Sequence, residues 1–183
     1  FFIGIIILGI ICYIDDVKGI PTLIKLLAQI LAAIIVVMSG IRIENFTLPF
    51  TDNKIIINEV FSYLITIGWI VGITNAINLI DGLDGLSAGI GVISCFSLLM
   101  IFALNNSPLI SILLVTALAG SLVGFLPFNF NPAKTFMGDT GSNFLGYTLA
   151  TISIIGLAKG YTLLTVFAPL VIVGVPVFDM LFA

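Results

Sequence analysis

Two adjacent carboxylates stand where the first apolar run of the chain ends. Asp15 and Asp16 follow residues 1–14, Lys18 comes two residues later, and Lys25 lies one to two turns into the next expected helix. Adjacent carboxylates repel each other, and each costs about 2.5–3.5 kcal/mol deep in a bilayer. A hard cation such as Mg²⁺, which takes oxygen ligands and bridges to phosphates, would explain the pair. The alternative is a polar helix end at the membrane interface with no ligand.

A second polar group runs out of an apolar segment near the middle of the chain. Asn75, Asn78 and Asp81 are spaced by three, so on a helix they form one polar stripe. Asp84 continues the stripe if the helix does, although the glycines around it suggest a break. Such a stripe is costly in a membrane helix unless it lines a bundle interior or a wet cavity. The alternative is that the Asn side chains bond between helices while the Asp side chains are solvated.

The third group is the segment 131–142, Asn-Pro-Ala-Lys-Thr-Phe-Met-Gly-Asp-Thr-Gly-Ser, which precedes an apolar run. Its glycines allow a tight turn around a ligand. Thr140 and Ser142 could cap the following helix, whose N-terminus favours an anion. Asp139 at that place suits a metal that holds a diphosphate. A turn and cap without a ligand is the alternative.

Taken together, the three groups combine carboxylates and lysines in a sequence that has no histidine. This combination favours phosphate chemistry on a divalent metal, which neutralises charge as a P–O bond exchanges. Two interpretations of other classes stay open: an ion-coupled transporter, whose acids should lie near the bilayer midplane, and a non-catalytic scaffold.

The composition places these groups in a membrane. Hydrophobic residues make up 60% of the 183 positions and charged residues 8%. A soluble domain is nearer half apolar and a quarter charged, so lipid must be the solvent here. The six Lys and Arg residues are spread singly, which leaves no basic patch and excludes nucleic acid as an expected partner.

The apolar segments predict an all-α fold, a polytopic transmembrane helical bundle that forms a single integral-membrane catalytic domain over 1–183. Seven spans are expected, at 1–14, 22–40, 59–79, 88–104, 108–126, 143–157 and 161–181. Links between spans must alternate between the two membrane faces. The links 15–21, 81–87 and 127–142, which carry all three chemical groups, therefore share one face. Basic residues divide equally between the faces, so charge does not orient the bundle.

Five segments in this order resemble the polyprenyl-phosphate N-acetylhexosamine-1-phosphate transferase family. They are 14–16, 25–29, 75–86, 132–146 and 174–179. The resemblance implies a fold of about ten helices, of which this chain would hold the third to the ninth. It also implies a multi-pass protein of the cytoplasmic membrane with its active site facing the cytoplasm. UDP-N-acetylhexosamine and undecaprenyl phosphate would be the substrates, and Mg²⁺ the cofactor, with Mn²⁺ as an alternative. A homodimer is left open.

The resemblance also implies roles for single residues. Asp15 and Asp16 resemble the acidic pair near the lipid phosphate and the metal, with the choice between nucleophile and base left open. Asp139 resembles a Mg²⁺ ligand, so the catalytic and metal candidates are Asp15, Asp16 and Asp139. The candidates for substrate binding are Lys25, which would hold phosphate, Asn78, Asp81 and Asp84 in the nucleotide-sugar site, Lys134, and Phe136, which would stack on uracil.

The sequence departs from the family pattern in two ways and carries features of one branch of the family. The family carries a His-x-His-His motif that this sequence lacks, and two preceding helices are missing. We interpret the chain as a fragment and expect 1–183 alone to be inactive, so turnover by the purified fragment would contradict us. Ile80 and Lys134 favour the N-acetylglucosamine-type branch, which starts teichoic acids or O-antigens. The alternative is the phospho-N-acetylmuramoyl-pentapeptide transferase of peptidoglycan synthesis.

Overall fold

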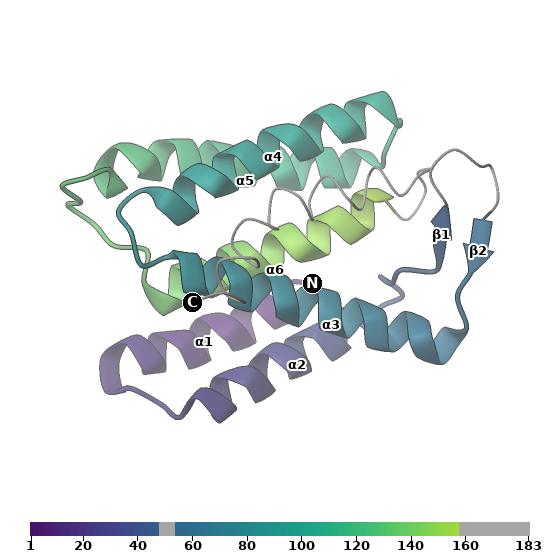
Figure 1. Cartoon of the computed structure of the whole chain (residues 1–183), viewed down its shortest axis with the longest axis horizontal. Coiled ribbons are helices and arrows are strands. Elements are labelled where there is room, and N and C mark those ends of the chain that lie inside the picture. The colour runs from purple at the N-terminus through teal and green to yellow at the C-terminus, as the bar shows by residue number, and fades with distance from the viewer. Residues whose placement is uncertain (48–53, 158–183) are drawn as a thin grey trace.

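The computed structural model describes residues 1–47 and 54–157, which form six helices and one short hairpin (Figure 1). The elements are α1 (Phe2–Lys18), α2 (Thr22–Met38), β1 (Asn45–Thr47), β2 (Lys54–Ile56), α3 (Glu59–Ile80), α4 (Leu86–Leu104), α5 (Leu109–Asn129) and α6 (Gly138–Leu157). The expected span 161–181, the link 158–160 and the segment 174–179 lie outside the described residues. The expected helical bundle is otherwise confirmed, and the antiparallel hairpin β1–β2 in the second link is an addition.

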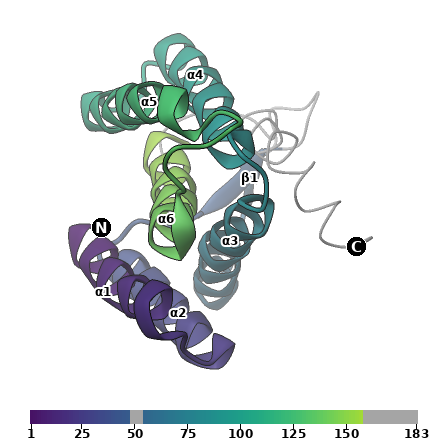
Figure 2. The same ribbon diagram turned by 90° about the vertical axis from the view of Figure 1, so that its left-hand side faces the viewer.

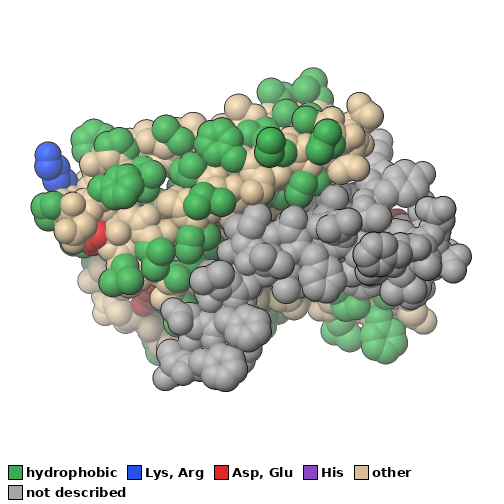
Figure 3. Space-filling model, turned by 45° about the horizontal axis from the view of Figure 1, so that its top comes forward, with side chains coloured by type: hydrophobic (Ala, Val, Ile, Leu, Met, Phe, Trp, Pro, Cys, Tyr) green, Lys and Arg blue, Asp and Glu red, His purple; other side chains and the backbone are tan. Residues whose placement is uncertain are grey.

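The helices have the length and surface of membrane spans. Among the described residues, α3, α4 and α5 are each long and apolar enough to cross a bilayer, and α2 is a shorter apolar helix. Large apolar side chains such as Met100, Leu104 and Leu109 are exposed on α4 and α5. Figure 3 shows hydrophobic side chains over the described part of one face, with few charged ones among them. The chain is therefore part of a multi-pass membrane protein.

Helix α6 occupies the centre of the bundle. It packs against α1 and α3 on one side and against α4 and α5 on the other (Figure 2). Its side chains Leu145, Tyr147 and Ile152 are almost completely buried. A helix surrounded in this way holds its N-terminal residues in a fixed place relative to the neighbouring helices.

The close approach of α6 to α3 depends on Gly146. A Cβ added at Gly146 would lie 2.6 Å from the Thr74 Cα and 3.1 Å from the Ile73 carbonyl oxygen. Backbone atoms cannot yield as the end of a side chain can. The two helices would have to separate to admit even a methyl group.

We therefore expect Gly146→Ala to lower the thermal midpoint of the protein in detergent by several degrees, since overpacking costs about 1–3 kcal/mol. Gly120→Ala in α5 is the matched control, because a Cβ at Gly120 meets no described atom within 4 Å. Its midpoint should stay unchanged or rise slightly. Equal midpoints for the two variants would contradict the close packing of α3 and α6.

The three links that carry the chemical groups lie at one end of the bundle, as the alternation of links predicts. Figure 1 shows the α1–α2, α3–α4 and α5–α6 connections on the same side and the hairpin on the opposite side. Glycines with positive φ, namely Gly19 and Gly85, help to end one helix and begin another at this side. The bundle thus brings distant parts of the chain to one membrane face.

Several expected helix boundaries were wrong by about one turn. Helix α1 continues through Asp15 and Asp16 to Lys18, and α6 begins at Gly138 instead of residue 143. Helix α5 also continues past Pro127 to Asn129. Polar residues that the sequence placed in links are helical in the structure. Side chains such as those of Asp15 and Asp16 have hydrogen-bond or ion-pair partners on neighbouring helices.

Candidate active site

The ammonium group of Lys25 is the centre of a charged junction between three helices. Its Nζ lies 2.5 Å from an oxygen of Asp15 in α1 and 2.5 Å from an oxygen of Asp139 in α6. The side chains of Lys25 and Asp15 are only 15% and 9% exposed. Partial burial strengthens such pairs because water screens them less. Residues 15, 25 and 139, predicted separately from the sequence, are therefore in direct contact.

Helix α3 joins this junction through Asn78. The Asn78 Nδ2 donates hydrogen bonds to the second oxygen of Asp139, at 2.5 Å, and to Ser142 Oγ, at 2.8 Å. Both Asp139 oxygens thus have partners, one cationic and one neutral. The Asp139 carboxylate is held in one orientation by side chains from α2 and α3.

The carboxylate of Asp16 caps the N-terminus of α6. It accepts hydrogen bonds from the backbone N–H groups of Asp139, at 2.9 Å, and Thr140, at 3.1 Å, and from the Thr140 hydroxyl, at 2.6 Å. The expectation that Thr140 and Ser142 cap α6 is thus wrong. The helix begins before both residues, so Thr140 donates to Asp16 and Ser142 donates to the Gly138 carbonyl. The anion expected at this N-terminus is Asp16 itself.

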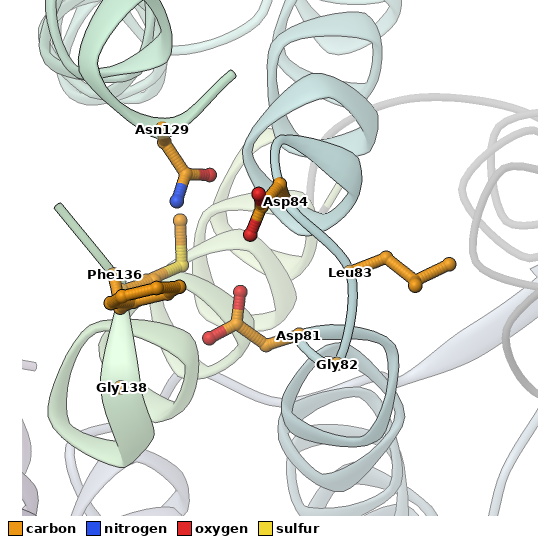
Figure 4. Close-up of a pocket in the computed structure, with 8 residues that line it drawn as sticks. Asp81, Gly82, Leu83, Asp84, Asn129, Phe136 and Gly138 are labelled. Atoms are coloured by element: carbon orange, nitrogen blue, oxygen red, sulfur yellow. The ribbon is translucent and has the colours of Figure 1, made fainter. Parts of the chain in front are cut away.

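A small cavity opens beside the junction (Figure 4). Its volume is about 160 Å³, and it is lined by Asp81, Gly82, Leu83, Asp84, Asn129, Phe136, Met137 and Gly138. Figure 4 shows the Asp81 carboxylate and the Phe136 ring facing each other across the cavity. Burial raises the pKa of Asp81, and the nearby Asp139 charge raises it further, while a hydrogen bond from Ser87 acts in the opposite direction. The Phe136 ring is 73% exposed, so its face is open to a ligand.

Asp84 and Asn129 hold the two walls of this cavity together. One Asp84 oxygen accepts hydrogen bonds from Asn131 Nδ2 and from the Ala133 N–H, both at 3.1 Å. Asn129 accepts from the Gly85 N–H at 3.1 Å and donates to the Thr135 carbonyl at 2.9 Å. Asp84 therefore leaves the polar stripe of α3, which ends at Ile80, and ties the 81–85 link to the 130–137 link.

Lys134 lies in the second of these links with an exposed side chain. Its backbone N–H donates to the Phe128 carbonyl at 2.8 Å, which fixes the turn but leaves the ammonium group outside the junction. The structure therefore joins Lys25, and not Lys134, to the carboxylates.

Four polar residues of the site were not among the candidates: Gln29, Ser87, Asn129 and Asn143. Gln29 and Asn143 are 1% and 0% exposed and lie deeper in the bundle than Lys25 and Asp139. A signal for Gln29 and Asn143 was present in the sequence, because each of these two follows a charged candidate by four residues. On a helix this spacing places the two side chains on the same face.

The donor chemistry of the junction fits a hard divalent cation. Asp15 and Asp139 bring carboxylate oxygens from two helices to the same cationic partner. Among residues 1–47 and 54–157 no cluster of three or more Asp, Glu, His or Cys side chains is arranged to enclose a metal. Mg²⁺ commonly binds through one or two carboxylates together with substrate phosphates and water, so such an enclosure is not required.

The fold and the site define a multi-pass helical membrane protein with a carboxylate–lysine junction at one end. The chain belongs to glycosyl transferase family 4, whose model matches residues 1–157. It is 45% identical over 179 residues to a "probable undecaprenyl-phosphate N-acetylglucosaminyl 1-phosphate transferase" of Bacillus subtilis (strain 168), covering 98% of this chain and 49% of that protein.

Relatives named for a second activity are also similar. The chain is 41% identical over 161 residues to a phospho-N-acetylmuramoyl-pentapeptide-transferase of Staphylococcus epidermidis (strain ATCC 12228 / FDA PCI 1200). It is 42% identical over 163 residues to one of Staphylococcus aureus (strain JH9). Each match covers 80% of this chain and 49% of the relative. The chain thus spans about half the length of the curated relatives it matches.

Proposed function

We propose that the protein carrying this chain transfers N-acetylhexosamine-1-phosphate, in particular N-acetylglucosamine-1-phosphate, from a UDP-sugar to undecaprenyl phosphate and releases UMP. The observation that carries the proposal is the junction of Lys25 with Asp15 and Asp139 beside the cavity of Asp81 and Phe136. Membership of glycosyl transferase family 4 and the similarity to the Bacillus subtilis relative support the same reaction.

The reaction exchanges one P–O bond for another. An oxygen of the lipid phosphate attacks the β-phosphorus of the UDP-sugar, and the bond from that phosphorus to the bridging oxygen breaks. UMP leaves with the bridging oxygen, and the new lipid diphosphate carries the sugar. The charge on both phosphates must be neutralised as they approach, which a lysine ammonium can do at short range.

Each residue of the candidate site has a different role in this reaction, according to its position. Lys25 lies between the carboxylates and donates to phosphate oxygens, while Asn78 orients Asp139. Phe136 stacks on the uracil ring at the mouth of the cavity, and Asp84 keeps the 130–137 link in place. Mg²⁺, held by Asp139 and Asp15, would neutralise charge on the diphosphate when bound. Asp16 keeps the Asp139 backbone in place through its cap on α6.

The proposal also orients the protein. A UDP-sugar is a charged, hydrophilic donor of the cell interior, so the end of the bundle with the site faces the cytoplasm and the hairpin end faces outward. The acids of the candidate site, from the 15–16, 81–84 and 139 positions, lie in links and helix ends on one side of the bundle (Figure 1 shows these connections), which does not favour an ion-coupled transporter.

The test uses the full-length protein in detergent with undecaprenyl phosphate and Mg²⁺. UDP-N-acetylglucosamine and UDP-N-acetylmuramoyl-pentapeptide are offered in parallel, and UMP release is measured. Release from the first donor alone supports the proposal. Release from the second alone would assign the protein to peptidoglycan synthesis, and release from neither would reject both reactions.

Phe136→Ala should raise the KM for the UDP-sugar about tenfold with a smaller change in kcat, because stacking on a base contributes about 1–3 kcal/mol. Steady-state kinetics with varied donor and saturating lipid measure this effect. Phe128→Ala is the control, since Phe128 is also exposed, at 55%, but does not line the cavity. An unchanged KM in Phe136→Ala would contradict the stacking role.

A further inference from the structure

A layer of amide side chains, two of them almost fully buried and one partly buried, lies one helical turn below the charged junction. The Gln29 Nε2 donates to Asn143 Oδ1 at 2.7 Å and to Asn75 Oδ1 at 3.3 Å, and the Gln29 Oε1 accepts from Asn75 Nδ2 at 2.6 Å. The Asn143 Nδ2 donates onward to the Asp139 carbonyl at 2.8 Å. We refer to Gln29, Asn75 and Asn143 as the amide layer.

Helices α2, α3 and α6, three of the four helices that form the charged junction, also form the amide layer, at matching positions. Gln29 follows Lys25 by four residues in α2, and Asn143 follows Asp139 by four residues in α6. Asn75 precedes Asn78 by three residues in α3, which runs in the opposite direction. Each helix thus places one residue in each layer, on the same face and one turn apart.

The amide layer spans a diagonal of the bundle. Helix α2 packs against α1 and α3, and α6 packs against the same two helices, so α2 and α6 stand at opposite corners of a four-helix group (Figure 2). Two side-chain connections cross this diagonal: Lys25 to Asp139 and Gln29 to Asn143. Lys25 must contact substrate in the proposed reaction. The hydrogen bond from Gln29 to Asn143 is therefore the connection between α2 and α6 that remains constant during turnover.

The hydrogen bonds of this layer are directional, whereas the apolar contacts around it are not. Both N–H groups of Gln29 donate and its oxygen accepts, inside a site where Gln29 is 1% exposed. A shift of α2 along its axis by one residue, about 1.5 Å, would leave buried amides without partners, which costs more than the bonds contribute. The layer therefore permits a single axial position of α2 against α6.

We propose that Gln29, with Asn143 and Asn75, is a positioning residue that sets the distance between Lys25 and Asp139 in the active site. This inference rests on the proposed transferase function for its kinetic consequence, but its structural consequence can be measured without turnover. Gln29 contacts no substrate and acts through Lys25 and Asp139.

The test compares full-length protein with Gln29→Met, Asn143→Leu and the double variant, since these substitutions remove the amides and keep similar side-chain volumes. Each single variant should lower kcat about 10- to 100-fold, the range expected for a displacement of about 1 Å. The KM for the UDP-sugar should change by less than about threefold. The double variant should be no worse than the worse single variant, because either change breaks the same connection.

A second measurement is independent of activity. Lys25 is labelled with an acetylating reagent in detergent, and its modification is measured by mass spectrometry against that of exposed Lys134 in the same molecules. Lys25 labelling should rise severalfold in Gln29→Met relative to wild type, because the ammonium is no longer held between Asp15 and Asp139. Unchanged Lys25 labelling in both single variants would overturn the proposal, whether or not the protein releases UMP.

Thr66→Val provides the matched control at the opposite end of α3. Thr66 is fully buried, accepts from the Ile43 N–H at 3.0 Å and donates to the Ser62 carbonyl at 2.7 Å. This variant also removes a buried polar group, and its kcat per folded molecule and Lys25 labelling should match wild type.

If Gln29→Met lost thermal stability like Thr66→Val but kept full kcat, the amide layer would be structural only and the proposal would fail. Absence of UMP release from wild type would instead reject the proposed function, and the labelling would still decide this inference.

Discussion

Asp139→Asn is expected to abolish turnover by the full-length protein while leaving it folded and inserted in the membrane. The change is isosteric, so Asn78 can still donate to the remaining carbonyl oxygen at this position. What is lost is the negative charge that faces the Lys25 ammonium at 2.5 Å. In the proposed reaction Asp139 would also help to hold Mg²⁺, which would supply positive charge to the diphosphate. Loss of several kcal/mol of charge stabilisation corresponds to a fall in kcat of about 10³-fold or more.

The measurement is UMP release at saturating donor and lipid, together with the thermal midpoint in detergent. Glu59→Gln is the matched control at the hairpin end of the bundle, where Glu59 accepts from Arg42 at 2.8 Å and from Tyr63 at 2.8 Å. This variant removes an equally charged, paired carboxylate far from the site and should keep kcat. Near-normal turnover in Asp139→Asn would reject Asp139 as a metal ligand.

The arrangement of the site at one membrane face could be predicted from span counting alone. Apolar segments of membrane length are a strong signal, and alternation of links follows from the need to satisfy every backbone group in lipid. Errors of one turn in the helix boundaries did not alter the result, because they change where a helix ends but not the number of spans. The contact between Lys25 and Asp139, 114 residues apart, is a consequence of that topology.

The fine division of roles could not be predicted, because it depends on which side chains meet across helices. Asp81 and Asp84 both line the cavity, yet the Asp81 carboxylate accepts from the Ser87 hydroxyl and the Asp84 carboxylate accepts from the backbone of Ala133. The periodicity of α3 says only that both are near its end. Gln29 is similar: a single amide in an apolar helix is ordinary until its partners on α3 and α6 are known.

Asp15 and Asp16 are adjacent and identical in the sequence, yet they have different partners in the structure. As neighbours on a helix they point about 100° apart, so they meet different surroundings. Asp15 pairs with Lys25 at 2.5 Å, inside the junction. Asp16 accepts three hydrogen bonds from the first turn of α6, where a carboxylate satisfies free N–H groups and opposes the positive end of the helix dipole. Asp15 therefore pairs with the charge of Lys25 in the site, and Asp16 caps the N-terminus of α6.

Substitution should separate the two roles. Asp15→Asn is expected to lower kcat by about 10²-fold or more, because Lys25 loses one of its two carboxylate partners and Mg²⁺ would lose one of its two carboxylate ligands, with little change in thermal midpoint. Asp16→Ala is expected to lower the midpoint by a few degrees, because loss of a helix cap costs about 1 kcal/mol, and also to lower kcat as Asp139 loses its fixed backbone. Asp16→Asn keeps one oxygen that accepts from α6, so its midpoint should fall between those of wild type and Asp16→Ala.

Thermal melts and UMP release on all three variants measure these changes in midpoint and kcat. If Asp15→Asn and Asp16→Ala changed midpoint and kcat equally, the carboxylates would act as one unit and the division of roles would be wrong.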